Sequence, residues 1–267
     1  LIEQSDLDNR ALTQPMNIAL LVPALNEESA IERTAGVMCQ ALGAGIVQQA
    51  VVLDSGSTDN TSQIALQHGV DVLDVSRQCT EVGTVLGKGD SLWRGVATIS
   101  ANAYVFLDAD LGNISVHHVE QLVSALSKTS TMFVKSSFHR VDSEGKSRAI
   151  PAGRVSEEVG RPLLELVDPW LAALPQPLSG QIAIRAELLR SLQLVTGYGI
   201  EIAMLIDIWN AVGQQAIATV DLGDINNRWK PSNALDDVRD HVLSGATLCG
   251  VTLPERGSVS HSEVVRR

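Results

Sequence analysis

Two aspartates, Asp108 and Asp110, directly follow the apolar run YVFL at residues 104–107. The run has the composition of a strand buried on both faces, and such strands usually end where the chain reaches water. If the chain stays extended, the two side chains point to the same side, about 7 Å apart. Two carboxylates so placed suit a divalent cation or a ribose. A solvated turn with one aspartate capping the next helix is the alternative, because short motifs recur by chance.

Four other polar segments stand at the ends of predicted elements: PALNEE (23–28), DSGSTDNT (54–61), GKGD (87–90) and GRVSEE (153–158). In the first, Pro23 and Leu25 shape a turn, and Glu27 can accept a hydrogen bond from a nucleobase. In the last, Arg154 and the hydroxyl of Ser156 stand beside the free backbone NH groups of a helix start. Such a start is an anion site.

The two middle segments also suit a ligand. Gly56 lets the backbone approach a ligand closely, and Ser57, Thr58 or Asp59 can cap the following helix. Two glycines flank Lys88, so its ammonium can reach a phosphate without steric obstruction. Taken singly, each segment also fits a capped helix start or an exposed turn. Their succession at the ends of successive strands favours one shared binding site.

The elements that must position these segments alternate along the first half of the chain. Short apolar runs predict strands, and amphipathic stretches between them predict helices. The strands are expected at 17–25, 50–54, 70–75, 103–107 and 131–138, and the helices at 29–43, 61–69, 90–100 and 117–127. This alternation is typical of an α/β fold with a Rossmann-like, mostly parallel sheet and helices on both faces. Ligands of such sheets bind beyond the carboxyl ends of the strands, where the polar segments fall.

The second half is less regular and more helical. Residues 154–174 predict one helix or two, divided near Asp168 and Pro169, because proline disfavours helix in the residue before it. A strand running into a helix, a strong helix, a further strand and a final helix follow at 181–189, 200–213, 216–223 and 233–250.

Composition limits the classes of partner. The 267 residues suffice for one large domain or two small ones, and 45% apolar with 19% charged residues is typical of a globular protein. A net charge of -11 argues against nucleic acid or an anionic membrane as the main partner, although a local basic cluster can still bind a small anion.

Three cysteines, Cys39, Cys79 and Cys249, are widely spaced and lack metal-site spacing, which favours a reducing compartment. No apolar stretch reaches the length of a membrane span, and the acidic N-terminal residues lack the pattern of a signal peptide. We therefore expect a cytoplasmic protein.

Seven segments together resemble the glucosyl-3-phosphoglycerate synthases, which are retaining glycosyltransferases of the GT-A fold: PALNEE, DSGSTDNT, GKGD, DADL, AGRVSEEVGRPLL, QPLSGQ and GYGIEI. The first four are shared widely among GT-A transferases, whereas GRV, PLSG and GYGIEI select this family. The resemblance covers residues 17–225 and implies one GT-A domain. We expect a lead at 1–16, a nucleotide-sugar-binding half at 17–140, a helical acceptor-binding half at 141–252 and a flexible tail at 253–267.

The resemblance implies transfer of glucose from UDP-glucose to 3-phosphoglycerate, with Mg²⁺ or Mn²⁺ bound and the anomeric configuration retained. Family members are dimers, so a homodimer is expected. Asp110 matches the carboxylate that ligates the metal on the diphosphate. In the family's reaction the acceptor attacks from the side that UDP leaves, without a protein nucleophile, and Asp110, Lys88 and Glu201 are the expected catalytic residues.

Further roles follow the motifs of the resemblance. The positions that hold uridine are matched by Pro23, Ala24, Leu25 and Glu27, with Ser55 beside them. Lys88 matches the lysine near the donor, and Asp108 the aspartate on the side of the ribose and the metal.

The acceptor side has its own matches. Gly153, Arg154 and Ser156 match the positions that grip the phosphate and carboxylate of 3-phosphoglycerate, with Ser156 in place of the usual threonine. The residues that match the lining of the sugar and the acceptor hydroxyls are Gly180, Tyr198 and Glu201.

The chain departs from the family pattern in LGDINNRWKP, residues 222–231. The family's second metal ligand, a histidine, falls on Asn227, which is a neutral and weaker oxygen ligand. Asp224 or His241 are alternative ligands. An asparagine that contacts the acceptor is replaced by Trp229, which offers one donor and a large ring.

These departures keep other functions open. One is a nucleotide-sugar-binding protein with an altered acceptor or lost turnover. Another is a related transferase using a different nucleotide sugar such as GDP-mannose. A third is an inverting transferase that acts on lipid phosphates, which would need a carboxylate base near the acceptor.

Overall fold

The computed structural model describes residues 16–150, 153–226, 235–252 and 265–266. The expected lead, except Met16, therefore lies outside the described residues, as do the predicted site residues Asn227 and Trp229. Within the described ranges, no helix combines the length and the apolar character needed to cross a membrane.

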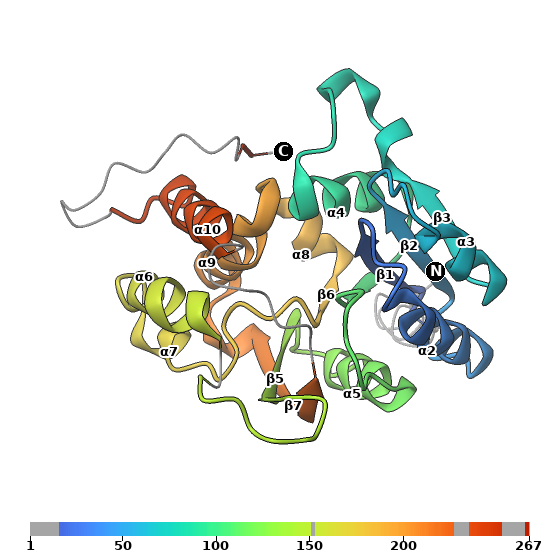
Figure 1. Cartoon of the computed structure of the whole chain (residues 1–267). Helices are drawn as coiled ribbons and strands as arrows, with labels where there is room; N and C mark the ends of the chain where they lie inside the picture. Colours follow the sequence, from blue (N-terminus) through green and yellow to red (C-terminus); the bar gives the residue numbers. More distant parts are fainter. Residues whose placement is uncertain (1–15, 151–152, 227–234, 253–264, 267) are drawn as a thin grey trace, which may run out of the picture.

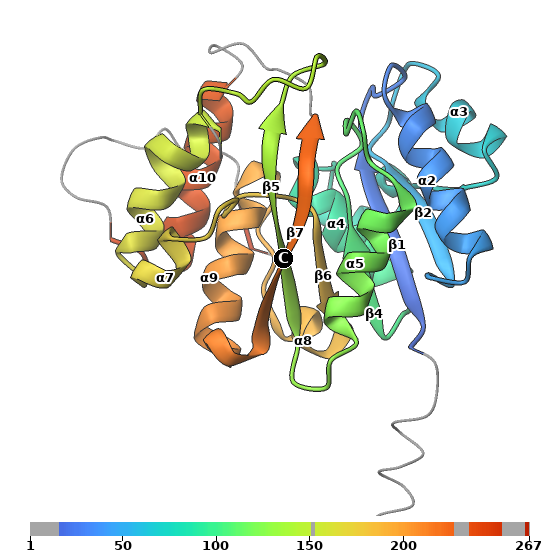
Figure 2. The same ribbon diagram turned by 90° about the horizontal axis from the view of Figure 1, so that it is seen from below.

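Seven strands form one sheet in the order β3-β2-β1-β4-β6-β5-β7 (Figures 1 and 2). Four of its six strand pairs are parallel, and β6 runs antiparallel to both of its neighbours. The prediction of a mostly parallel sheet is therefore confirmed. The strands are β1 Ile18–Ala24, β2 Gln49–Asp54, β3 Asp71–Asp74, β4 Ala103–Phe106, β5 Phe133–Val141, β6 Ile182–Arg185 and β7 Ile217–Asn226.

Helices cover both faces of the sheet, as the alternation predicts (Figure 2). The α-helices of the described residues are α2 Ile31–Gly43, α3 Thr61–Gln67, α4 Gly87–Thr98, α5 Val116–Leu126, α6 Arg161–Glu165, α7 Pro169–Ala172, α8 Ala186–Ser191, α9 Ile200–Val212 and α10 Asp236–Leu248. Because successive strand residues point to opposite faces, Leu20 packs in the core under α2 and α5, and Leu21 in the core under α4 and α9. Strands β1 and β4 are buried on both faces, which explains their uninterrupted apolar runs.

The helical segment after Gly153 divides where proline predicts. A π-helical turn at Ser156–Gly160 leads into α6, and a second helix, α7, begins at Pro169. The carboxylate of Asp168 accepts a hydrogen bond from the backbone N–H of Trp170 at 2.8 Å, so it caps α7. Of the two alternatives, one helix or two, the structure has two, divided at the predicted point.

Residues 265 and 266 contact the body of the protein beside α9. Thr196 donates its backbone N–H to the carbonyl of Val265 at 2.9 Å. Arg266 donates from Nη1 to Oδ2 of Asp207 on α9 at 2.9 Å. These contacts hold Val265 and Arg266, the described residues of the expected tail, against the body of the protein.

Candidate active site

A cavity of about 660 Å³ opens beyond the carboxyl ends of β1, β2 and β4. Its wall combines the turns after these strands, the start of α4, the segment after β5 and the start of α9. The predicted site residues that line it are Pro23, Ala24, Leu25, Glu27, Ser55, Lys88, Asp108, Asp110, Gly153, Arg154, Ser156, Tyr198 and Glu201. Residues from six segments of sequence thus meet in one place only through the parallel sheet and its connections.

The turns after β1 and β2 hold each other. Asn26 donates its backbone N–H to the hydroxyl of Ser57 at 3.0 Å, and its side-chain oxygen accepts from the backbone N–H of Thr58 at 2.9 Å. Asn26 has a φ of 55°, a left-handed conformation that asparagine tolerates better than most residues. The two turns therefore form one rigid wall of the cavity.

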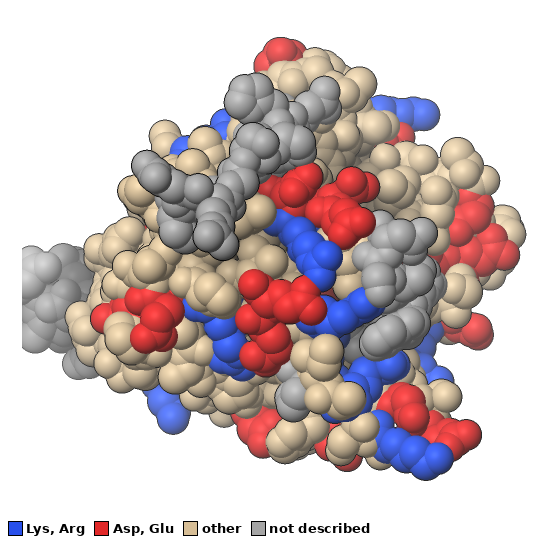
Figure 3. Space-filling view, turned by 60° about the vertical axis from the view of Figure 1, so that its left-hand side comes forward, with Lys and Arg blue, Asp and Glu red and all other residues tan. Residues whose placement is uncertain are grey.

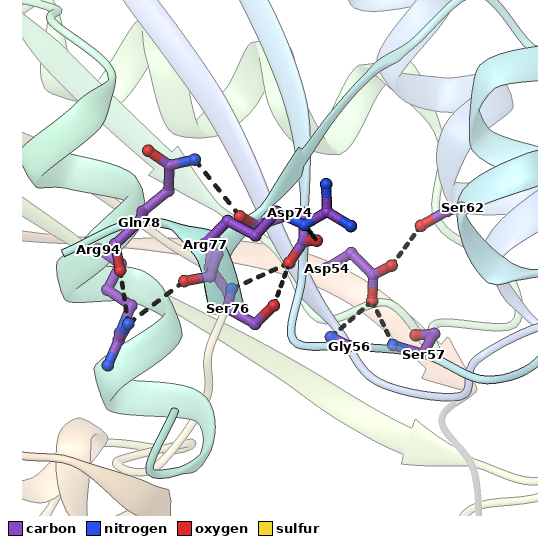
Figure 4. A network of polar contacts seen from close by, with 10 residues as sticks. Asp54, Gly56, Ser57, Ser62, Asp74, Ser76, Arg77, Gln78 and Arg94 are labelled. Carbon is purple, nitrogen blue, oxygen red and sulfur yellow. Dashed lines mark hydrogen bonds and ion pairs between the residues drawn. The ribbon is translucent and has the colours of Figure 1, made fainter. Parts of the chain in front are cut away.

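Asp54, the last residue of β2, shapes the second turn from within (Figure 4). Its Oδ1 accepts from the backbone N–H groups of Gly56 and Ser57 at 3.2 and 2.8 Å, and its Oδ2 accepts from the hydroxyl of Ser62. Gly56 has a φ of 95°, which only glycine adopts readily. Asp54 is thus a structural carboxylate that orders the DSGSTDNT segment.

The chain turns at Ala109 and Asp110 instead of staying extended after β4. The hydroxyl of Thr34 fixes this turn by donating to the carbonyl of Ala109 at 2.9 Å. Asp108 and Asp110 still line the same cavity. Asp108 accepts from Nε2 of Gln181 at 2.6 Å.

Lys88 lies between two carboxylates at the floor of the cavity. Its Nζ is 2.5 Å from Oδ1 of Asp108 and 2.6 Å from Oε1 of Glu201. Burial opposes the charge on Lys88, but the two carboxylates outweigh burial and raise the pKa of its ammonium. Burial likewise opposes ionisation of Asp108, yet Lys88 and Gln181 hold its pKa below the usual value. Lys88 and Asp108 are therefore charged at neutral pH.

The glycines that flank Lys88 have a different role from the one predicted. A Cβ on Gly87 would lie 3.1 Å from Cα of Gly197, and one on Gly89 would lie 2.0 Å from the carbonyl oxygen of Val195. Both glycines therefore allow α4 to pack against the segment that leads to Tyr198. In addition, α4 begins at Gly87, so GKGD is the first turn of a helix and not a loop before it.

Asp90 and Arg94 of α4 order the loop that precedes Lys88. Both side chains are fully buried, and Nη2 of Arg94 is 3.3 Å from Oδ2 of Asp90. Arg94 also donates to the carbonyl of Gln78 at 2.5 Å (Figure 4). It donates to the carbonyl of Gly83 at 2.7 Å as well. A charge removed from water needs such partners, and here they fix the path of the chain into the cavity wall.

Gly153, Arg154 and Ser156 line the cavity, but the helix start that carries them differs from the expected one. Ser156 lies buried at the start of the π-helical turn, and the helical conformation already begins at Arg154. Glu157 donates its backbone N–H to the carbonyl of Gly153 at 3.0 Å, so one of the expected free NH groups is used. Gly153 has a φ of 87°, which lets the chain turn sharply into the helix.

Two arginines in the wall were not predicted from the sequence. Arg140 at the end of β5 and Arg148 in the following segment line the cavity. The guanidinium of Arg140 lies 5.5 Å from the ring centroid of Phe138. Burial lowers the pKa of Arg140, and Asp108 and Asp110 counteract part of that effect. A β-bulge between Ser137 and His139 changes the direction of this end of the strand. No pattern in the sequence predicts that bulge.

Tyr198 is held by His241 of α10. The backbone N–H of Tyr198 donates to Nδ1 of His241 at 3.1 Å, and the two rings stack with centroids 6.1 Å apart. This contact occupies Nδ1 of His241. Asp224, the other alternative ligand, lies at the surface with Oδ1 3.8 Å from Nδ1 of His139. Neither alternative is supported.

Comparison with known proteins agrees with this geometry. Residues 19–173 match the model of glycosyl transferase family 2. The glucosyl-3-phosphoglycerate synthase of Mycobacterium tuberculosis (strain ATCC 25618 / H37Rv) is 39% identical over 248 residues, which cover 90% of this chain and 75% of that protein. The chain belongs to the glucosyl-3-phosphoglycerate synthase family. The synthase of Petrotoga mobilis is 38% identical over 213 residues, covering 78% of this chain and 66% of that protein.

Solved structures of glucosyl-3-phosphoglycerate synthase show the same GT-A fold. The M. tuberculosis synthase in complex with Mn²⁺, UDP and glucosyl-3-phosphoglycerate has a TM-score of 0.79 at 37% identity, covering 96% of this chain and 88% of that one. Its complex with phosphoglyceric acid has a TM-score of 0.81 at 36% identity, covering 96% and 89%. The expected fold and the glycosyltransferase class are therefore confirmed.

The described residues fit a metal site in which the protein supplies few ligands and the diphosphate of the substrate supplies the rest. They contain no cluster of three or more His, Cys, Asp or Glu side chains suited to a metal ion. Asp110 supplies a hard carboxylate in the cavity wall, whereas Asp108 and Glu201 pair with Lys88. Such a site suits Mg²⁺, which takes one or two carboxylates and completes its octahedron with phosphate oxygens and waters.

Proposed function

We propose that this chain transfers glucose from UDP-glucose to 3-phosphoglycerate, giving glucosyl-3-phosphoglycerate and UDP, with Mg²⁺ or Mn²⁺ bound. The observation that carries the proposal is the meeting of Lys88, Asp108, Asp110 and Glu201 with three arginines in one cavity. The M. tuberculosis relative has been solved with Mn²⁺, UDP-glucose and phosphoglyceric acid together, at a TM-score of 0.79 and 36% identity.

The two substrates occupy different halves of the domain. We call residues 17–140 the donor half and residues 141–252 the acceptor half. Uridine rests on the rigid wall built from the turns after β1 and β2, and the diphosphate lies toward Asp110. The phosphate and carboxylate of the acceptor face Arg148, Arg154 and Arg140, whose guanidinium groups suit both anions geometrically.

The residues act mainly through position and charge. Asp110, with Asn227 as a further oxygen ligand, would hold the metal, and the metal would supply charge stabilisation to the leaving diphosphate. Lys88 and Glu201 hold the sugar so that the acceptor hydroxyl attacks on the face that UDP leaves. Holding both reactants in this geometry removes much of the entropic barrier, and the configuration is retained without a protein nucleophile.

We also propose that the protein is a cytoplasmic homodimer. Support for a dimer comes from the acceptor half, where Leu166 is 59% exposed and the rings of Trp170 and Trp209 stack 5.4 Å apart, each partly exposed. Apolar side chains gathered at a surface favour association. Static light scattering after size-exclusion chromatography would give twice the chain mass of 28.5 kDa for a dimer and the single mass for a monomer.

The proposed activity is tested by UDP release from UDP-glucose and Mg²⁺, with and without 3-phosphoglycerate, followed by mass analysis of the product. Acceptor-dependent release with a glucosylated phosphoglycerate is expected. Binding of UDP-glucose without release under Mg²⁺ or Mn²⁺ would instead favour the nucleotide-sugar-binding protein that Asn227 and Trp229 suggest. GDP-mannose as a parallel donor distinguishes a transferase of different donor specificity.

A further inference from the structure

A second lysine lies beneath the floor of the cavity, where no motif drew attention to it. Lys135 of β5 is 2% exposed, and its Nζ donates to the carbonyl of Ser179 at 2.7 Å. It shares a small enclosed space of about 10 Å³ with Lys88, Gly180 and Glu201. That volume admits about one water molecule, so the ammonium is almost entirely removed from solvent.

The surroundings of Lys135 are charged on one side only. Its strand neighbours are Ile182 on β6 and Thr219 on β7, and both are uncharged. The titratable groups that face it from the packed elements are Glu201 of α9, Lys88 of α4 and Asp108 at the end of β4.

We propose that Lys135 is a positioning residue for the nucleotide-sugar donor, because it fixes the Ser179–Gly180 turn against Lys88 and sets the net charge of the floor. The inference rests on the proposed function, since it takes a sugar nucleotide as the ligand above that floor.

The Ser179–Gly180 turn links Lys135 to the floor of the cavity through direct packing. A Cβ on Gly180 would lie 2.5 Å from Nζ of Lys88 and 2.6 Å from Oδ1 of Asp108, so the backbone of the turn packs directly against this pair. The next residue, Gln181, donates to Asp108 at 2.6 Å. Any shift of the turn therefore moves both charged groups that line the donor site.

Charge is the second link between Lys135 and the donor. Lys88, Asp108 and Glu201 sum to one negative charge, and a protonated Lys135 brings the floor to neutrality. Burial lowers the pKa of Lys135 to about 7, with Glu201 opposing that effect and Lys88 adding to it. A bound diphosphate favours the protonated lysine, so donor binding takes up protons near neutral pH and weakens as the pH rises.

The test is calorimetric titration of UDP-glucose, with Mg²⁺, into four proteins at about pH 6 and about pH 8.5. Wild-type protein is expected to lose about tenfold in affinity between the two, the size expected for one unit charge near an anion at a protein's effective dielectric constant. Lys135→Met keeps a similar volume without charge and should bind weakly at both pH values. Lys135→Arg cannot lose its proton and should bind tightly at both.

The matched control is Ser136→Ala. Ser136 holds the same turn through a neutral contact, with its hydroxyl 3.0 Å from that of Ser179. This variant should weaken binding by the same factor at both pH values, so the pH dependence of the wild type survives. A purely structural role for Lys135 would instead make Lys135→Met behave like Ser136→Ala.

Proton uptake by the wild-type protein needs no variant that might fail to fold. Titrations at about pH 7 in two buffers of different ionisation enthalpy should show a fraction of a proton taken up per UDP-glucose. No uptake, or a pH dependence unchanged in Lys135→Met, would overturn the inference and leave the transferase proposal intact. No binding of UDP-glucose to the wild type would overturn both.

Discussion

The donor half and the acceptor half build their shares of the site by different means. In the donor half, short-range groups shape the turns: Asp54 bonds to backbone N–H groups two and three residues on. In the acceptor half, ion pairs span long stretches of sequence: Glu201 reaches Lys88 across 113 positions, and Arg239 pairs with Glu158 at the surface across 81. Hydrogen bonds within and between the two turns make one rigid wall of the cavity, whereas the ion pair of Lys88 and Glu201 brings charge from the acceptor half into it.

Acidic and basic side chains are mixed on the surface of the molecule. Acidic and basic side chains lie beside one another on the face in Figure 3, so the net charge of -11 does not gather there as one acidic field. A small anion can therefore approach a protein that is acidic overall, because screening limits distant charges to about 10 Å at moderate salt.

Removing the metal carboxylate should have the largest effect on the donor half. Asp110→Ala is expected to lower kcat for UDP release by about a thousandfold, since the charge on the leaving diphosphate loses its main stabiliser. Initial rates of acceptor-dependent UDP release measure this. Asp224→Ala removes an equal charge from the surface and should leave the rate unchanged; equal losses in both variants would contradict the assignment.

A methyl group at the contact between the halves should have the next largest effect. In Gly180→Ala the new Cβ collides with Nζ of Lys88, so the lysine must leave its carboxylate partners, and kcat should fall by about a hundredfold. Gly36→Ala on α2 meets open space and serves as the control, with full activity and slightly raised thermal stability expected. A fully active Gly180→Ala protein would show that this contact does not position Lys88.

Loss of a guanidinium proposed to face the acceptor should have a smaller and more selective effect. Arg140→Gln is expected to raise KM for 3-phosphoglycerate about tenfold, the usual scale for a charge-assisted hydrogen bond. Steady-state kinetics with each substrate varied in turn would separate the two KM values. Arg77→Gln, at an exposed position, is the control, and a rise confined to KM for UDP-glucose would place Arg140 on the donor instead.

The buried Lys135 should have the smallest expected effect, a pH-dependent change in the free energy of unfolding. Because burial lowers the pKa of Lys135 to about 7, the unfolded chain binds more protons than the native protein above that pH. The free energy of unfolding of the wild type should therefore rise by about 1 kcal/mol between pH 7 and pH 8, relative to Lys135→Met. Urea denaturation at both pH values measures the difference, and parallel curves for the two proteins would contradict a lowered pKa.

The sequence by itself determined the α/β alternation and the family. It also determined which polar residues stand at strand ends. The cavity wall contains Pro23, Glu27, Ser55, Asp108 and Asp110 for one physical reason: apolar runs mark buried parallel strands, and their carboxyl ends share one edge. Backbone bonds within a few residues then shape each turn, so local sequence carries that information.

Only the tertiary structure decided which distant groups meet. It inserted β6 antiparallel between β4 and β5, and a bulge in β5 aimed Arg140 into the cavity. It also enclosed Lys135 under Ser179 and packed Gly89 against the backbone of Val195. A charge reveals its burial, its partner and its pKa only when segments far apart in the sequence are brought together, because these properties depend on distance in space and not on order along the chain.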